Sequence, residues 1–219
     1  MKLEAAIFDL DGTLVDTEGR NFEAWNCALA PFGIVLSEAD YAGYVGKSGN
    51  IIETELQKSY GKAMPGLYKM KDKFVEGAWQ EGKISCMPFA HESIGFFRSR
   101  GLKIGIATGT TRRLAKLKVE RADFGSLHTL VVREDVKNVK PAPDIYLLAV
   151  ERLGLPAGRC VAFEDTQFGV ESAVAAGLKC YAIPNKYSRG QDFSKAGEVF
   201  IDLWQAVKHV AEAYALFNL

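Results

Sequence analysis

Short apolar runs alternate with helical patterns along most of this chain, and this alternation strongly limits the folds that the chain can adopt. Each run is four to six residues long and is followed by turn residues or by a helix. The runs are EAAIF (4–8), KIGIAT (103–108), HTLVV (128–132), RCVAFE (159–164), KCYAI (179–183) and EVFI (198–201). Strands that alternate with helices form a parallel sheet. The sequence therefore predicts an α/β fold in which helices cover both faces of a parallel sheet.

One region interrupts the alternation. Residues 16–85 carry helical patterns only, such as FEAWNCALAPFG and LYKMKDKFVEGAW. The second pattern places four residues on one side of a helix: Leu67, Met70, Phe74 and Ala78. We therefore expect a small α-helical cap domain at residues 16–85, inserted into a core domain made of residues 1–15 and 86–219.

The overall composition excludes several classes of protein. Lys plus Arg and Asp plus Glu each number 27 in the 219 residues, so the total charge indicates neither a nucleic-acid nor a membrane partner. The four cysteines are far apart and match no disulfide framework or metal-ligand spacing. No stretch approaches 18 uncharged apolar residues. We expect a cytoplasmic protein with reduced thiols.

The stretch IFDLDGTLVDTE (7–18) places two carboxylates, Asp9 and Asp11, at the end of the first predicted strand. Side chains alternate along an extended segment, so two residues that are two apart point to the same side. The carboxyl edge of an open α/β sheet is where such folds bind ligands. Two like charges held close together require a bridging cation such as Mg2+, or a proton on one of them. A bridging cation predicts a metal site at this edge of the sheet, and a shared proton predicts a site of proton transfer.

Plainer interpretations of these residues also exist. Asp and Gly are common in turns, so Asp9, Asp11 and Gly12 can simply form a loop. A calcium-binding EF-hand loop is excluded because Leu14 and Arg20 stand where it needs Gly and Glu. The GKS at residues 46–48 is no phosphate-binding P-loop, since its first Gly is missing and a helical region precedes it.

Three other predicted strand or helix ends carry polar groups suited to a phosphate or a metal. Thr108 and Gly109 follow a strand and offer a hydroxyl and backbone N–H groups at the start of a helix. Lys140, in KPAPDIY, is framed by prolines before a helix, and Glu164 and Asp165 end the strand RCVAFE. Taken singly, each can be a helix cap or a solvated charge.

Together, in this order and context, DLDGT, a strand ending in Thr, KPAPDIY and FEDTQFGVESAVAAG resemble the haloacid dehalogenase superfamily. The similarity covers essentially the whole chain and is to the branch with a helical cap after the first strand. Residues 7–25 look most like β-phosphoglucomutase and its sugar-phosphatase relatives. The resemblance implies a Rossmann-like core domain beside the cap.

The resemblance also implies roles for the motif residues. Asp9 would attack a phosphate monoester and form an aspartyl-phosphate, while Asp11 protonates the leaving alcohol and later activates water. Thr108, Gly109 and Lys140 would bind the transferring phosphoryl group.

Mg2+ is the cofactor that the resemblance implies. The ion would be held by the Asp9 carboxylate, the backbone carbonyl of Asp11, and Asp165. Glu164 would either be a further ligand of the ion or accept a hydrogen bond from a residue next to the ligands.

Asp11 indicates a phosphatase or a phosphomutase, because dehalogenases of this superfamily lack it. The mutase has a histidine where this chain has Asn21, and an arginine where it has Gly49. Lys47 is a point charge that does not replace the bidentate arginine. We therefore predict a Mg2+-dependent phosphatase acting on a small phosphorylated metabolite, a sugar or polyol phosphate, with Asn21 and Lys47 binding the substrate. A phosphomutase and a non-catalytic binding protein are the alternatives.

Overall fold

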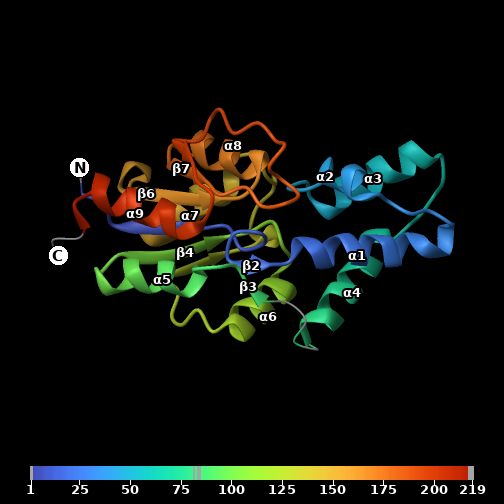
Figure 1. Cartoon of the computed structure of the whole chain (residues 1–219), viewed down its shortest axis with the longest axis horizontal. Helices are drawn as coiled ribbons and strands as arrows, with labels where there is room; N and C mark the ends of the chain where they lie inside the picture. Colours follow the sequence, from blue (N-terminus) through green and yellow to red (C-terminus); the bar gives the residue numbers. More distant parts are fainter. Residues whose placement is uncertain (1, 81, 83–84, 217–219) are drawn as a thin grey trace.

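The computed structural model describes residues 2–80, 82 and 85–216. Its main sheet has six strands in the order β5-β4-β1-β6-β7-β8, and every neighbouring pair is parallel (Figure 1). The strands are β1 (Ala5–Phe8), β4 (Lys103–Ala107), β5 (Thr129–Val131), β6 (Cys160–Glu164), β7 (Lys179–Ala182) and β8 (Glu198–Val199). Each lies within a run predicted from the sequence, which confirms the α/β fold and its parallel sheet.

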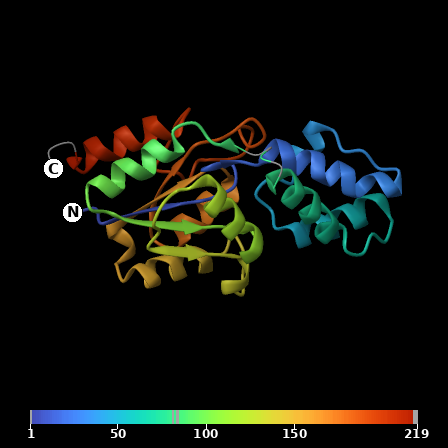
Figure 2. The same cartoon turned by 90° about the horizontal axis from the view of Figure 1, so that it is seen from below.

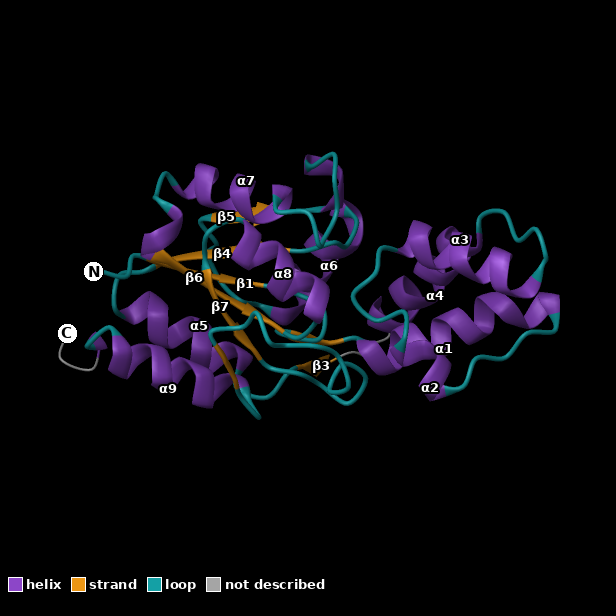
Figure 3. Cartoon of the chain, turned by 90° about the horizontal axis from the view of Figure 1, so that it is seen from above, coloured by secondary structure: helices purple, strands orange, loops and turns teal. Residues whose placement is uncertain are grey.

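Helices cover both faces of this sheet, as Figure 3 shows. Alternate residues of β1 enter two separate cores: Ala6 and Phe8 lie in one, and Ala5 and Ile7 in the other. The first core also contains residues of α5 (Ala90–Ser99), α6 (Arg112–Ala122) and α9 (Leu203–Ala213). The second contains residues of α7 (Asp144–Leu153) and α8 (Gln167–Ala175). Burial on both faces explains why the inner strands β1, β4 and β6 are mostly apolar.

Four helices lie together at one end of the molecule, beside the sheet (Figures 1 and 2). They are α1 (Glu18–Leu29), α2 (Glu38–Ala42), α3 (Gly49–Tyr60) and α4 (Leu67–Gln80). Their shared apolar cluster includes Trp25, Leu29 and Leu56. The face predicted for the last helix is partly wrong: Phe74 is 47% exposed, while Val75 is buried.

A two-stranded ribbon joins these helices to the sheet. Strand β2 (Val15–Asp16) pairs antiparallel with β3 (Ser85–Cys86), so the chain enters and leaves the helical region side by side. Two-residue strands are too short to produce an alternating pattern, so the sequence did not predict them. The ribbon lies at the boundary expected between core and cap, and that division of the chain stays a prediction.

The described residues also form short 3-10 helices: η1 (Ala30–Phe32), η2 (Arg133–Asp135) and η3 (Ala157–Arg159). Among the helices of the described residues, none has the length and apolar character needed to cross a membrane.

Candidate active site

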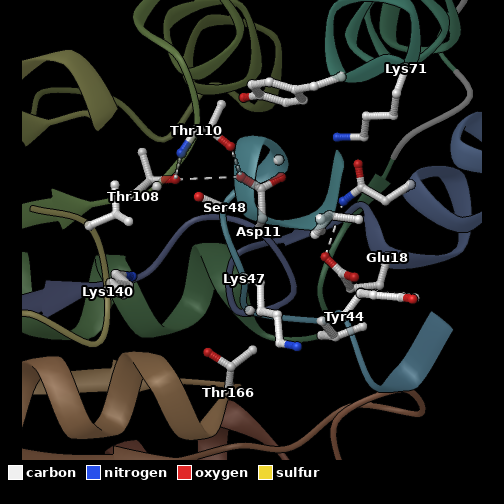
Figure 4. Close-up of a pocket in the computed structure, with 18 of the residues that line it drawn as sticks. Asp11, Glu18, Tyr44, Lys47, Ser48, Lys71, Thr108, Thr110, Lys140 and Thr166 are labelled. Atoms are coloured by element: carbon white, nitrogen blue, oxygen red, sulfur yellow. Dashed lines mark hydrogen bonds between the residues drawn. The ribbon is translucent and has the colours of Figure 1, made fainter. Parts of the chain in front are cut away.

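A cleft with a cavity volume of about 130 Å³, open to solvent, lies between the carboxyl edge of the sheet and helices α1, α3 and α4 (Figure 4). The predicted site residues that line it are Asp9, Asp11, Asn21, Lys47, Thr108, Gly109, Lys140 and Asp165. Asp9 follows β1, Thr108 follows β4 and Asp165 follows β6, so parallel strands bring them to the same edge. Glu164 is fully buried and does not line the cleft.

Lys140 links Asp9, the candidate nucleophile, to strand β4 by hydrogen bonds. Its Nζ donates to Asp9 Oδ1 at 2.5 Å, to Glu164 Oε1 at 2.6 Å and to the backbone oxygen of Ala107 at 3.0 Å. The Tyr146 hydroxyl donates to the same Glu164 oxygen at 2.7 Å. Burial lowers the pKa of Lys140, but Asp9 and Glu164 outweigh it and the pKa is raised. The ammonium is therefore charged and held in place by the side chains of Asp9 and Glu164.

Asp165 is fixed by two residues that the sequence analysis missed. Its Oδ1 accepts from the Thr13 hydroxyl at 3.1 Å, and its Oδ2 accepts from Asn185 Nδ2 at 2.7 Å. Gly12, with φ +85°, passes so close that a Cβ there would overlap the Asp165 carboxylate. The glycine of DLDGT is therefore required both by its backbone conformation and by this close approach. Asn185 stands three residues after β7, another polar residue near a strand end.

Three buried carboxylates gather at the base of the cleft. Oxygen atoms of Asp9, Glu164 and Asp165 lie within 4.8 Å of one another. Burial raises the pKa of Asp9 to about 8, with Glu164 and Asp11 adding to the rise and Lys140 opposing it. Burial and the charges of Asp9 and Glu164 likewise raise the pKa of Asp165 well above its ordinary value. A buried set of oxygen donors with excess negative charge fits a hard divalent cation.

The Asp11 carboxylate is turned toward α6 and the loop before it. Oδ2 accepts from the Thr110 hydroxyl at 2.6 Å, and Oδ1 accepts from the ammonium of Lys118 (Figure 4 shows Thr110). Thr108 Oγ1 lies 3.5 Å from Oδ2. Burial raises the pKa of Asp11, but Lys118 and the hydrogen bonds outweigh it and lower the pKa to about 2. Neither Thr110 nor Lys118 was expected in this site from the sequence.

Opposite the sheet, Glu18 and its partners line the cleft. The Tyr41 hydroxyl donates to Glu18 Oε2 at 2.7 Å, and Asn21 Nδ2 donates to Oε1 at 3.1 Å. Burial raises the pKa of Glu18. Asn21 Oδ1 is buried and has no hydrogen-bond partner among the described residues. This side of the cleft therefore offers acceptors, an arrangement suited to hydroxyl donors.

Lysines also reach this side. Lys71 lines the cleft, whereas Lys69 and Lys73, each two residues away from it, do not. The Lys71 ammonium lies 6.0 Å from the centre of the Trp25 ring, and burial lowers its pKa. Lys47 also lines the cleft, and its ammonium is paired with Glu55 at 2.8 Å.

Tyr68 occupies the space beside Gly49, the first residue of α3. A Cβ at position 49 would overlap the Tyr68 ring. The backbone N–H of Tyr68 donates to Glu53 Oε2 at 2.8 Å, which connects α3 to the start of α4. A long side chain at position 49 would thus have to displace an aromatic ring that lines the cleft.

Comparison with known proteins gives the family. Residues 6–183 match the model of the haloacid dehalogenase-like hydrolases. This chain belongs to that family. It is 34% identical to protein CbbY of Rhodobacter capsulatus over 208 residues, 90% of this chain and 92% of the relative. It is 32% identical to a phosphorylated carbohydrates phosphatase of Thermotoga maritima over 205 residues, 90% of this chain and 93% of the relative.

Among solved structures, a mutant of CbbY from Rhodobacter sphaeroides in complex with xylulose-(1,5)bisphosphate has a TM-score of 0.81 and 25% identity. The match covers 91% of this chain and 94% of that one. The resemblance that the sequence motifs carried is therefore confirmed at the level of family and fold. The chain is a haloacid dehalogenase-like hydrolase with a Rossmann-like core.

Proposed function

We propose that this enzyme is a Mg2+-dependent phosphatase that hydrolyses a small sugar or polyol phosphate through an aspartyl-phosphate. The observation that carries the proposal is the convergence of Asp9, Asp11, Lys140 and Asp165 from separate strand and helix ends on one cleft. A relative named as a phosphorylated carbohydrates phosphatase, 32% identical over nearly its full length, supports the same reaction.

In this mechanism, an oxygen of the Asp9 carboxylate attacks phosphorus and the bond from phosphorus to the ester oxygen breaks. Asp11 gives a proton to the departing alcohol oxygen, and then takes a proton from the water that attacks the aspartyl-phosphate. This second attack releases inorganic phosphate and restores the Asp9 carboxylate. Lys140, Thr108 and the Gly109 N–H stabilise the charge on the phosphoryl oxygens.

The carboxylates of Asp9 and Asp165, together with the backbone carbonyl of Asp11, would hold Mg2+. When bound, the ion offsets the repulsion between an anionic nucleophile and an anionic phosphate. We assign Glu164 to the layer behind these ligands, because its Oε1 already accepts from Lys140 and Tyr146. In that place it keeps Lys140 charged and directed toward Asp9.

The opposite side of the cleft would bind the part of the substrate that is not transferred. Glu18 and the free Oδ1 of Asn21 accept hydrogen bonds, and Lys71 donates them, which fits the hydroxyl groups of a sugar or polyol. For Lys47 to bind a substrate anion, its pair with Glu55 must open. Closure of the helical region over the cleft would exclude bulk water during the first step.

The position of Tyr68 favours hydrolysis over the phosphomutase alternative. A mutase must hold the second phosphate of a bisphosphate while it turns over, and a bidentate arginine suits that task. Tyr68 fills the space that a side chain at position 49 would need. The aspartyl-phosphate would therefore pass its phosphoryl group to water more often than to a second sugar phosphate.

The test is a screen of purified protein with Mg2+ against a panel of sugar, polyol and other small organic phosphates, measuring released phosphate. We expect release from at least one sugar or polyol phosphate and none with Asp9→Asn. No release from any ester would support the non-catalytic alternative. With β-glucose 1-phosphate and a trace of the bisphosphate, phosphorus NMR that shows glucose 6-phosphate accumulating without matching phosphate release would support a mutase instead.

A further inference from the structure

Helix α6 buries a lysine where packing alone needs none. Its inward-facing residues are Leu114, Ala115, Lys118 and Ala122, so one face of the helix is otherwise apolar. The Lys118 side chain is only 3% exposed. A buried ammonium is costly unless it is paired, and an apolar side chain would fill this position without that cost. The presence of lysine therefore calls for a reason other than packing.

The partner of Lys118 supplies that reason. Its ammonium donates to Oδ1 of Asp11, while the Thr110 hydroxyl donates to Oδ2 at 2.6 Å. Thr110 is itself fixed, because its backbone N–H donates to Thr108 Oγ1 at 3.1 Å. With one donor on each oxygen, the Asp11 carboxylate cannot rotate without breaking a hydrogen bond. Lys118 lies on α6 and Thr110 lies in the loop that joins β4 to it.

Lys118 also counters repulsion. Asp11 lies close enough to Asp9 and Glu18 for its charge to raise the pKa of both. The ammonium of Lys118, paired with Asp11, offsets part of this repulsion between like charges. Lys118 and Asp11 both line the cleft, so the pair stands where a substrate would lie.

We propose that Lys118 is a positioning residue, which holds the Asp11 carboxylate in place to exchange a proton with the ester oxygen of the substrate. This inference rests on the proposed phosphatase function. Lys118 acts through Asp11, so it matters most when the departing alcohol needs a proton. It matters little for an aryl phosphate, whose leaving group departs without one.

The test compares Lys118→Met with two other variants. Lys118→Arg keeps the charge, and Lys116→Met removes an exposed lysine from the same helix as the matched control. Each variant is assayed in single-turnover phosphorylation with a sugar or polyol phosphate that the wild type hydrolyses and with p-nitrophenyl phosphate. Circular dichroism checks that each variant is folded, and Lys118→Gln replaces Lys118→Met if the latter is not.

We expect Lys118→Met to lower the rate of phosphorylation with the sugar or polyol phosphate about tenfold to a hundredfold, with little change in KM. This is the range for an acid that is misplaced or lost. The rate with the aryl phosphate should fall much less. Lys118→Arg should recover part of the rate, and Lys116→Met should match the wild type. In an Asp11→Asn background, Lys118→Met should cause almost no further loss, because residues that act as one unit are not additive.

Equal losses for the two substrates, or a full additional loss in the Asp11→Asn background, would overturn the positioning role while leaving the phosphatase function standing. A wild-type protein that releases no phosphate from any ester would overturn the proposed function, and this inference with it.

Discussion

Replacing Tyr146 by phenylalanine tests the buried network that supports Lys140. The substitution removes one hydroxyl, which donates to Glu164 Oε1 at 2.7 Å, and both side chains are fully buried. A hydrogen bond to a charged group contributes about 1.5–3 kcal/mol to stability. For a chain of 219 residues, 1 kcal/mol shifts the melting temperature by about 2–4 °C. We therefore expect Tyr146→Phe to melt about 3–12 °C below the wild type.

Tyr181 provides a matched control. It is also fully buried in the sheet, on β7, but its hydroxyl has no hydrogen-bond partner among the described residues. Removing an unpaired buried hydroxyl leaves no group unsatisfied, so Tyr181→Phe should melt at or slightly above the wild-type temperature. Thermal unfolding followed by circular dichroism, at one pH and without Mg2+, measures both variants. Equal shifts in the two variants, or no shift in Tyr146→Phe, would refute the reasoning.

Three further predictions concern the carboxylates. Asp9→Asn should abolish turnover while circular dichroism shows that the fold is intact, and phosphate release by the variant would contradict the mechanism. EDTA should stop phosphate release by the wild type until Mg2+ is added back. Asp11→Asn should slow the transfer of the phosphoryl group from a sugar phosphate to Asp9 about a hundredfold or more in single-turnover assays. An activated aryl phosphate should be slowed less, and equal slowing would exclude Asp11 as the acid. Finally, burial raises the pKa of Asp9 from 3.8 to about 8, so the folded state keeps a proton that the unfolded state loses between these values. Urea denaturation in EDTA should show stability falling from pH 4 to pH 8, with a shallower slope in Asp9→Asn; identical slopes would contradict this assignment.

The inner strands of the sheet could be predicted because their burial on both faces leaves a strong apolar signal. The convergence of Asp9, Thr108 and Asp165 followed from the same logic, since parallel strands present their carboxyl ends at one edge. The ribbon of β2 and β3 gives no such signal, because its two-residue strands are shorter than any repeating pattern.

Two of the side chains that were not predicted, Lys71 and Lys118, reach the cleft because of how their helices are rotated about their axes. On α4, Lys71 precedes the buried Val75 by four residues, so it lies on the inward side, while its neighbours Lys69 and Lys73 do not line the cleft. On α6, Lys118 follows the buried Leu114 by four residues, and a charge on an apolar face was the signal that could have found it. The partner of such a charge depends on tertiary packing. The spacing of residues along one helix carries no information about that packing.

The central strand of the sheet has a consequence for synthesis of the chain. β1 is wholly apolar and pairs with β4 on one edge and with β6 on the other, where Ala5 meets Cys160. The ribosome therefore makes β1 (Ala5–Phe8) long before its second partner β6 (Cys160–Glu164), because α1 to α7 lie between them along the chain. Until then the emerging chain carries an unpaired apolar edge, the kind of surface that chaperones shield and that joins other chains when it is left bare.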